Sequence, residues 1–448
     1  MNKVELLSPA GTLKNMRYAF AYGADAVYAG QPRYSLRVRN NDFLAENLKV
    51  GIEEAHRLGK KFFLAANVLP HNSKVKTFIK DIAPIVALGP DGLIMADPGL
   101  ILLALEAWPA MPIHLSVQAN TMNYAAVKFW QSIGIRRIIL SRELSLEEIA
   151  EIRQHCPDME LEVFVHGSLC IAYSGRCLLS GYFNHRDPNQ GTCTNACRWK
   201  YRVEPGQENG EGEYRPGSGV LSLADLSAGS SAEASEPRHP LADQIHFLEE
   251  ETRPGELMPV LEDEHGTYIM NSRDLRAVEH VQRLIEIGVD SLKIEGRTKS
   301  YYYVARTAQV YRRAIDDAAA GRDFDPALLG VLENLAQRGY TDGFYQRHHT
   351  RERQNYLRGH SESHRQQFVG EITGFESQSG RASVLVKNKF TVGDQLEIIS
   401  PGGNLDIRLD CLEDKAGNTL NEAPGGGWEV RIPIPPGRWD HGLIARYL

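Results

Sequence analysis

The chain has 448 residues, of which 42% are hydrophobic and 24% are charged, as in an ordinary folded globular protein. Its formal net charge of −7 argues against a nucleic-acid partner, but fifteen acidic residues and only three arginines lie between Glu204 and Glu264. The remainder is therefore mildly basic, and an anionic partner is not excluded.

Residues 92–108 are the most apolar region, and Asp97 with Pro98 interrupts it well short of the roughly 20 residues that span a bilayer. The N-terminal sequence has no basic segment followed by an apolar one, so no signal peptide is expected. We therefore expect no membrane association and a cytoplasmic location.

One sequence design recurs: an amphipathic run, a glycine, and then a short buried-type strand that ends in small or polar residues. Glycine readily adopts the left-handed conformation that ends a helix, so each copy predicts a helix leading into a strand. Eight strands are expected, at residues 4–10, 25–30, 61–67, 92–97, 113–120, 136–141, 161–167 and 291–296. Strands that alternate with helices favour a (β/α)8 barrel, of the TIM type, over an open doubly wound sheet.

The expected strands end in an unusual number of polar residues, which a (β/α)8 barrel would gather at its carboxyl-terminal mouth. These residues are Ser8, Tyr28, Asn67, Asp97, Gln118, Asn120, Ser141, Arg142, Glu143, His166, Lys293, Glu295 and Arg297. Helix capping is an alternative explanation for Asp97 and Asn120. Lys293, Glu295 and Arg297 alternate along one strand, so all three are expected to face the barrel lumen. His166 and Glu295 are our candidates for proton transfer.

Arginines near the expected mouth predict a site for an anionic small molecule. Arg33 and Arg37 lie in the loop after the second strand, and Arg142 and Arg297 follow the sixth and eighth strands. Planar guanidinium groups bind carboxylates and phosphates through paired hydrogen bonds. We assign these four arginines and Lys293 to substrate binding, although a solvated run of charges would explain the loop equally well.

Four of the six cysteines lie within residues 166–197. Their positions are Cys170, Cys177, Cys193 and Cys197, with six, fifteen and three residues between successive members. Clustered thiols without a secretory signal indicate a metal before disulfides. The spacing does not distinguish zinc from iron, and buried unligated cysteine remains an alternative.

Composition divides the chain into three parts. Residues 1–340 form the expected catalytic barrel, with a cysteine-rich and then acidic insertion at about 168–264 whose Gly-, Ser- and Glu-rich part predicts a flexible segment. Residues 341–365 are an expected basic linker, in which arginines and histidines suit either RNA contact or simple solvation. Residues 366–448 show short alternating strands, which predict a small antiparallel β-barrel module.

Three segments, residues 5–37, 166–199 and 291–300, resemble the collagenase-like or U32 peptidase family, and the resemblance covers most of the chain. It implies that Cys170, Cys177, Cys193 and Cys197 hold a 4Fe-4S cluster. The resemblance to tRNA-modifying members implies hydroxylation of the wobble uridine of tRNA to 5-hydroxyuridine, without molecular oxygen and with prephenate as hydroxyl source. The alternatives are a peptidase, although no HExxH or GxSxG motif is present, and a non-catalytic iron–sulfur protein that binds RNA.

Overall fold

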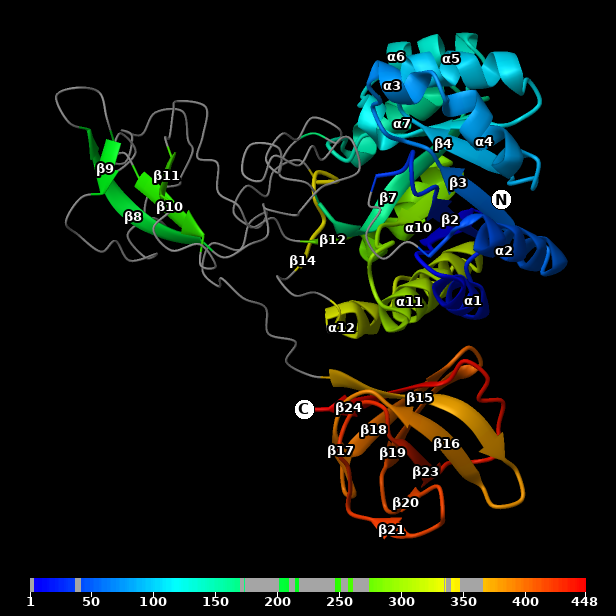
Figure 1. Ribbon diagram of the computed structural model, residues 1–448, viewed down its shortest axis with the longest axis vertical. Coiled ribbons are helices and arrows are strands. Elements are labelled where there is room, and N and C mark those ends of the chain that lie inside the picture. Colours follow the sequence, from blue (N-terminus) through cyan, green and yellow to red (C-terminus); the bar gives the residue numbers. More distant parts are fainter. Residues whose placement is uncertain are drawn as a thin grey trace.

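The computed structural model describes residues 4–36, 42–169, 173, 201–208, 214–216, 246–250, 257–260, 274–333, 335, 340–346 and 366–448. Helices surround a central parallel sheet, and a separate β-module that contains the C-terminus lies beside α1 and α11 (Figure 1). No helix in these ranges is long and apolar enough to cross a membrane.

The eight predicted parallel strands all form, and they close into a barrel. They are β1 (Glu5–Pro9), β2 (Ala26–Gly30), β3 (Lys61–Ala65), β4 (Gly92–Met95), β5 (Ile113–Leu115), β6 (Arg137–Ile139), β7 (Glu160–Ser168) and β13 (Ser291–Ile294). Each pairs in parallel with its neighbours, and β13 closes the ring by pairing with both β1 and β7. The (β/α)8 fold class is therefore confirmed.

The glycines of the recurring design end helices as predicted. Gly23, Gly59, Gly89, Gly134 and Gly288 have φ values of 103°, 66°, 75°, 101° and 91°. Side chains with a Cβ rarely adopt this left-handed conformation, so a glycine here stops the helix and turns the chain into the next strand.

The helices pack around the barrel. They are α1 (Leu13–Ala21), α2 (Ala45–Arg57), α3 (Asn72–Val75), α4 (Phe78–Val86), α5 (Pro98–Ala107), α6 (Tyr124–Ser132), α7 (Leu146–His155), α10 (Val281–Ile287), α11 (Tyr301–Ala319) and α12 (Ala327–Glu333), with 3-10 helices at Val117–Ala119 and Val278–His280. Asp97 caps α5 by accepting a hydrogen bond from the Leu100 amide (2.9 Å), which supports the capping alternative for this residue. Asn120 is the C-cap of the 3-10 helix Val117–Ala119, with a left-handed backbone (φ 51°).

The chain returns to the barrel after α12. β14 (Tyr340–Thr341) pairs with β12 (Asp274–Arg276), which pairs antiparallel with the end of β7. The buried Tyr345 donates a hydrogen bond to the Phe164 carbonyl oxygen (2.6 Å). Residues 341–346 therefore belong to the barrel, contrary to the expectation that the linker starts at 341. The polar residues around Tyr340 and Tyr345 made this segment resemble a linker in the sequence. Residues 347–365 of the expected linker lie outside the described residues.

The acidic insertion contains regular strands that its composition did not predict. β8 (Tyr201–Glu208), β9 (Tyr214–Pro216), β10 (His246–Glu250) and β11 (Leu257–Val260) form an antiparallel sheet in the order β11-β10-β8-β9. Strand pairing satisfies the backbone locally and needs few apolar residues, so a Gly- and Glu-rich average across the segment concealed it. The expectation of a flexible or loosely packed insertion did not include these strands.

The C-terminal module is the predicted antiparallel β-structure. Its strands are β15 (Gln366–Glu376), β16 (Arg381–Val386), β17 (Phe390–Thr391), β18 (Gln395–Ser400), β19 (Gly403–Arg408), β20 (Leu412–Asp414), β21 (Thr419–Leu420), β22 (Glu422–Ala423), β23 (Glu429–Pro433) and β24 (Leu443–Tyr447). Eight of them form one curved sheet around an apolar core that includes Val384, Leu396 and Ile432 (Figure 1). This core is separate from that of the barrel.

The β-module is docked on α1 and α11 through a buried interface. Tyr22, Tyr302 and Ala305 of the barrel share an apolar cluster with Ile399 and Leu443 of the module.

A buried ion pair lies in the same interface. The Arg306 guanidinium, 1% exposed, donates to both carboxylate oxygens of Glu397 (3.1 and 2.8 Å), and Gln366 donates to the same carboxylate (2.8 Å). Two charges that are paired and hydrogen-bonded in this way fix one docking geometry, because a shifted module would leave them buried and unpaired.

Candidate active site at the barrel mouth

A network of charged side chains lies in the barrel interior, below the carboxyl-terminal mouth. Arg137 donates to Glu5 (2.5 Å) and to Glu162 (3.2 Å), and Lys293 donates to the other oxygen of Glu162 (2.7 Å). Glu162 is 0% exposed and Lys293 is 2% exposed. Lys293 is therefore half of a buried ion pair within the barrel, which argues against its predicted contact with substrate.

Opposite charges in this network counteract the effect of burial on the pKa of their partners. Burial raises the pKa of Glu5, but Arg137 and Lys61 together outweigh burial and the net pKa is lowered. Burial lowers the pKa of Arg137, and Glu162 and Glu5 outweigh it, so the net pKa is raised. The pKa of Lys293 is lowered, mainly by burial, with Glu162 opposing the shift.

Lys293 supports Tyr28, which in turn contacts Glu295 at the mouth. The Lys293 Nζ atom lies 4.3 Å from the centre of the Tyr28 ring. The Tyr28 hydroxyl is within hydrogen-bonding distance of the Ile294 carbonyl oxygen (3.0 Å) and the Glu295 carboxylate (3.1 Å). Glu295 is half-buried, directly after the end of β13, and the Tyr28 hydroxyl holds its carboxylate. Its predicted role in proton transfer stays a prediction that this geometry favours.

His166 is enclosed by three tyrosines. Its ring centre lies 5.7, 5.5 and 5.2 Å from those of Tyr303, Tyr311 and Tyr340. The Tyr311 hydroxyl donates to the Val165 carbonyl oxygen (2.7 Å), so its oxygen is left to accept a hydrogen from His166 Nδ1 (3.3 Å).

The Tyr340 hydroxyl then donates to Nε2 of His166 (3.2 Å), which makes the ring the neutral Nδ1–H tautomer. Burial lowers the pKa of His166 to about 3. With both nitrogens occupied and a neutral ring at pH 7, these contacts favour a structural role over the predicted role in proton transfer.

The burial of neutral His166 predicts a pH-dependent stability. The unfolded chain binds a proton on His166 below about pH 6.5, whereas the folded chain does not until about pH 3, so the free energy of unfolding falls as the pH drops through this window. His166 alone should remove about 1.4 kcal/mol between pH 8 and pH 5.5. Urea unfolding of His166→Gln should show a smaller pH dependence than wild type.

The exposed His71 provides the matched control, and His71→Gln should keep the wild-type pH dependence. If the free energy of unfolding of His166→Gln depended on pH as strongly as that of wild type, the neutral state of His166 would be contradicted.

Arg297 ties the loop after β2 to the end of β13. Its guanidinium, 7% exposed, donates to Ser35 Oγ (2.5 Å) and to the Leu36 carbonyl oxygen. A Cβ atom on Gly30 would lie 2.3 Å from Arg297 Nη1 and 2.5 Å from Ser35 Oγ. The absence of a side chain at Gly30 therefore makes this clamp possible, and Arg297 contacts its own chain rather than open solvent.

Alanine at Gly30 should displace the Arg297 clamp. Overpacking of this degree costs about 1 to 3 kcal/mol, and we expect that loss of unfolding free energy in Gly30→Ala, measured by urea titration. A Cβ on Gly330 in α12 would meet nothing within 4 Å, so Gly330→Ala is the control and should not be destabilised. Equal stability of the two variants would show that the clamp yields without cost.

The other predicted arginines occupy different environments. Arg33, half-exposed, pairs with Asp81 (2.7 Å) outside the mouth. Arg142 lies at the mouth, where its guanidinium stacks over the Phe164 ring (3.9 Å) and donates to the Ser168 carbonyl oxygen (2.8 Å). Arg37 and the predicted metal ligands Cys170, Cys177, Cys193 and Cys197 lie outside the described residues.

Sequence reasoning missed the charged interior below the mouth. The predicted strands contain Glu5, Arg137 and Glu162. A charged residue within an apolar strand indicates a buried ion pair, so the sequence did contain a signal for this network. Charges at such positions must be paired, and barrel closure brings these three strands together.

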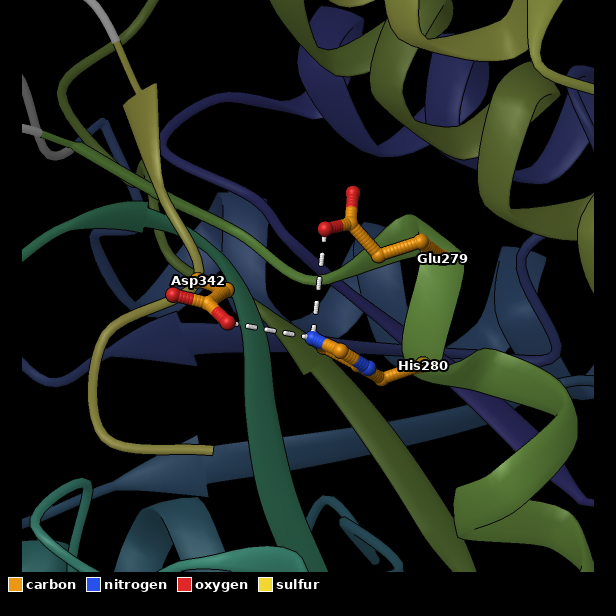
Figure 2. A group of neighbouring side chains, drawn as sticks. All are labelled: Glu279, His280 and Asp342. Carbon is orange, nitrogen blue, oxygen red and sulfur yellow. Dashed lines mark hydrogen bonds and ion pairs between the residues drawn. The ribbon is translucent and has the colours of Figure 1, made fainter. Parts of the chain in front are cut away.

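Glu279, His280 and Asp342 form a separate polar group (Figure 2). His280 Nε2 lies 3.4 Å from Asp342 and 3.9 Å from Glu279, at the junction of β12 and α10. The hydrogen bond between His280 and Asp342 accounts for this arrangement without a metal.

Comparisons with known proteins cover both parts of the chain. The family model of peptidase family U32 matches residues 11–355, and that of the peptidase family U32 C-terminal domain matches residues 364–446.

The relatives include RNA-modifying proteins. The chain is 62% identical over 439 residues to tRNA hydroxylation protein P of Escherichia coli (strain K12), which covers 97% of this chain and 94% of that protein. It is 58% identical over 447 residues to tRNA hydroxylation protein P of Haemophilus influenzae, covering 100% and 96%. A 23S rRNA 5-hydroxycytidine synthase of Escherichia coli is 29% identical over 353 residues, covering 77% and 45%. With its barrel and its module both matched, the chain belongs to peptidase family U32.

Proposed function

We propose that this protein is a tRNA-modifying enzyme that hydroxylates the wobble uridine to 5-hydroxyuridine in the cytoplasm, without molecular oxygen and with prephenate as hydroxyl source. The observation that carries the proposal is the 62% identity, over 97% of this chain, to a protein named for tRNA hydroxylation. Identity at this level over both domains supports a shared reaction as well as a shared fold.

Arg142 is our preferred residue for binding the carboxylate-bearing donor. Its Nε–H is buried and has no acceptor within the described part of the chain, and one Nη1–H contacts Ser168. A carboxylate would satisfy the free N–H groups, and the stacked Phe164 ring keeps the guanidinium plane fixed. Arg297 is already engaged by Ser35 and Leu36, so it serves better as a support than as a direct ligand.

Glu295 is our preferred proton acceptor for the reaction. Its carboxylate is positioned by the Tyr28 hydroxyl, and Lys293 below the Tyr28 ring limits how far that ring can move. A held carboxylate at a barrel mouth is suited to accept a proton from the bound substrate.

We further propose that Cys170, Cys177, Cys193 and Cys197 hold a 4Fe-4S cluster. Leu169 follows the last residue of β7 directly, so the first of these cysteines is next in the chain to the barrel mouth. Thiolates are the usual ligands of such clusters, and a bound cluster would supply electron transfer. The other two cysteines are elsewhere: Cys156 is buried at the end of α7, and Cys411 lies half-buried beside Arg381 in the β-module.

The described residues do not favour the peptidase alternative. A serine or cysteine nucleophile needs a basic histidine within hydrogen-bonding reach, and His166 at the mouth contacts tyrosines instead. A purely RNA-binding role would leave the positioned Glu295 and the unsatisfied Arg142 without a use.

Nucleoside analysis of tRNA tests the proposal. A strain that lacks this protein should lose 5-hydroxyuridine, and the wild-type gene should restore it during anaerobic growth but not when prephenate synthesis is blocked. Arg142→Ala should restore far less, because truncating one partner of a charge pair that the bound donor would bury costs about 2 to 5 kcal/mol of binding. The exposed Arg136 is the matched control. Unchanged 5-hydroxyuridine in the deletion strain would refute the function.

A further inference from the structure

Hydrogen bonds near the mouth determine which way the Gln118 side-chain amide points. The backbone amide of Leu36 can only donate, and it donates to Asn67 Oδ1 (3.1 Å). Asn67 must therefore present its Nδ2 to Gln118, where it donates to Oε1 (2.6 Å). The Ser116 hydroxyl lies 3.1 Å from the same oxygen and donates to it. Both ends of the Gln118 amide are thus assigned by the network.

The remaining end of Gln118 is a donor without an acceptor. Gln118 is 6% exposed, and its Nε2 atom is buried with no hydrogen-bond partner among the residues that the structure describes. Three residues later, the hydroxyl of Thr121, 1% exposed, is also buried without a partner. Buried polar groups are normally satisfied, so two orphans on one loop indicate a missing ligand rather than a packing requirement.

These two groups lie on the β5 side of the barrel mouth. His114 of β5 faces the lumen, where its ring lies 4.6 Å from that of Phe63. Side chains alternate along a strand, so Ser116 lies on the lumen side too, one step nearer the mouth, and it contacts Gln118. Asn67, which follows β3, reaches Gln118 from two strands away in the sheet.

We propose that Gln118 selects the pyrimidine base of the RNA by donating a hydrogen bond from Nε2 to the C4 carbonyl oxygen of uracil. This inference rests on the proposed function and adds the specificity determinant to it. Cytosine carries an amino group at C4, so a fixed donor at this position favours uracil and leaves cytosine with two opposed donors. The C4 atom adjoins C5, and the same bond therefore orients the carbon that is hydroxylated.

The Arg297 clamp gives this donor its fixed direction. Arg297 holds the Leu36 carbonyl oxygen, Leu36 orients Asn67, and Asn67 orients Gln118. Four chain segments, namely the end of β13, the loop after β2, the end of β3 and the loop after β5, are joined in this way. A glutamine on a mobile surface loop could rotate its amide and would not discriminate between the two bases.

Gln118→Glu replaces the unpartnered donor by an oxygen and adds a negative charge, while the retained oxygen still accepts from Asn67 and Ser116. In the deletion strain this variant should lower 5-hydroxyuridine at least tenfold relative to wild type, since an oxygen now faces the base carbonyl. Gln131→Glu, the same change at an exposed site on α6, should restore the wild-type level. Failure of the wild-type gene to restore 5-hydroxyuridine would instead count against the proposed function.

A double-mutant cycle isolates the contact itself. Anticodon stem-loops carrying uridine, or the same nucleoside without its C4 oxygen, are titrated with the purified holoprotein. Removal of the oxygen should weaken binding by wild type about tenfold and should have little effect on Gln118→Glu, or on Gln118→Met if the first variant does not fold. Equal binding of both RNAs by wild type would overturn the inference without requiring any variant.

The small donor is the competing ligand for Gln118. Two results together would assign Gln118 to the donor and overturn our proposal. The KM for prephenate would be raised in Gln118→Glu, and removal of the C4 oxygen would weaken RNA binding by this variant as much as by wild type.

Discussion

Serine in place of Cys170, Cys177, Cys193 or Cys197 should abolish both the iron–sulfur absorbance and the 5-hydroxyuridine of tRNA. A serine hydroxyl is a poor ligand for iron compared with a thiolate, so each substitution removes one of the four proposed cluster ligands. The measurement combines the visible spectrum and the iron and sulfide content of anaerobically purified protein with nucleoside analysis in the deletion strain. We expect hydroxylation to fall below detection in all four variants.

Cys156 and Cys411 provide the controls within the same chain. Cys156 is buried and its thiol donates to the Tyr124 carbonyl oxygen (3.6 Å), whereas Cys411 lies 3.9 Å from an Arg381 nitrogen in the β-module. Neither belongs to the cysteine-rich segment, so Cys156→Ser and Cys411→Ser should keep the cluster and the activity. Wild-type protein that contains stoichiometric zinc and neither iron nor sulfide would refute the cluster.

Gln in place of Glu162 should lower the free energy of unfolding by about 3 to 5 kcal/mol. Glu162 is fully buried and receives hydrogen bonds from Arg137 and Lys293, so its neutralisation leaves positive charge in the barrel interior with a weaker partner. Urea unfolding at pH 7 measures the effect. Tyr28 rests on Lys293, so the same substitution should also reduce hydroxylation in protein that remains folded.

Glu160 is the matched control for this prediction. It contacts the same arginine, Arg137, at 2.8 Å, but its side chain is 52% exposed and water can replace the lost interaction. Glu160→Gln should therefore change stability by less than about 1 kcal/mol. Similar losses in the two variants would mean that burial does not determine the strength of this network.

Local sequence was sufficient for the barrel because the signals that define it are local. The glycine at each helix end, such as Gly59, and the apolar run that follows it report on backbone conformation and burial at a single place in the chain. The same reasoning located Glu295 and Arg142 near the mouth, because strand order alone brings the strand ends together. It also recognised the β-module, whose alternating strands need no knowledge of the barrel.

The roles of individual charged residues depended on partners far away in the sequence. Lys293 and Glu295 are two residues apart in the chain, yet Lys293 pairs with Glu162 inside the barrel while Glu295, just past the end of β13, contacts Tyr28. The sequence position of His166 at a strand end suggested proton transfer. In the structure, three tyrosines from α11 and β14 enclose its ring.

The sequence by itself determined the eight-stranded barrel, the β-module and the set of polar residues at the strand ends, since periodicity and helix-ending glycines act over a few residues. Tertiary structure alone decided which of those polar groups are satisfied and which are not. Gln118 became a candidate for base selection because Asn67, more than 50 residues away and itself oriented by Leu36, occupies one end of its amide together with Ser116 and leaves the other without an acceptor. Hydrogen-bond satisfaction depends on atoms that meet only after folding, and no pattern of neighbouring residues can reveal it.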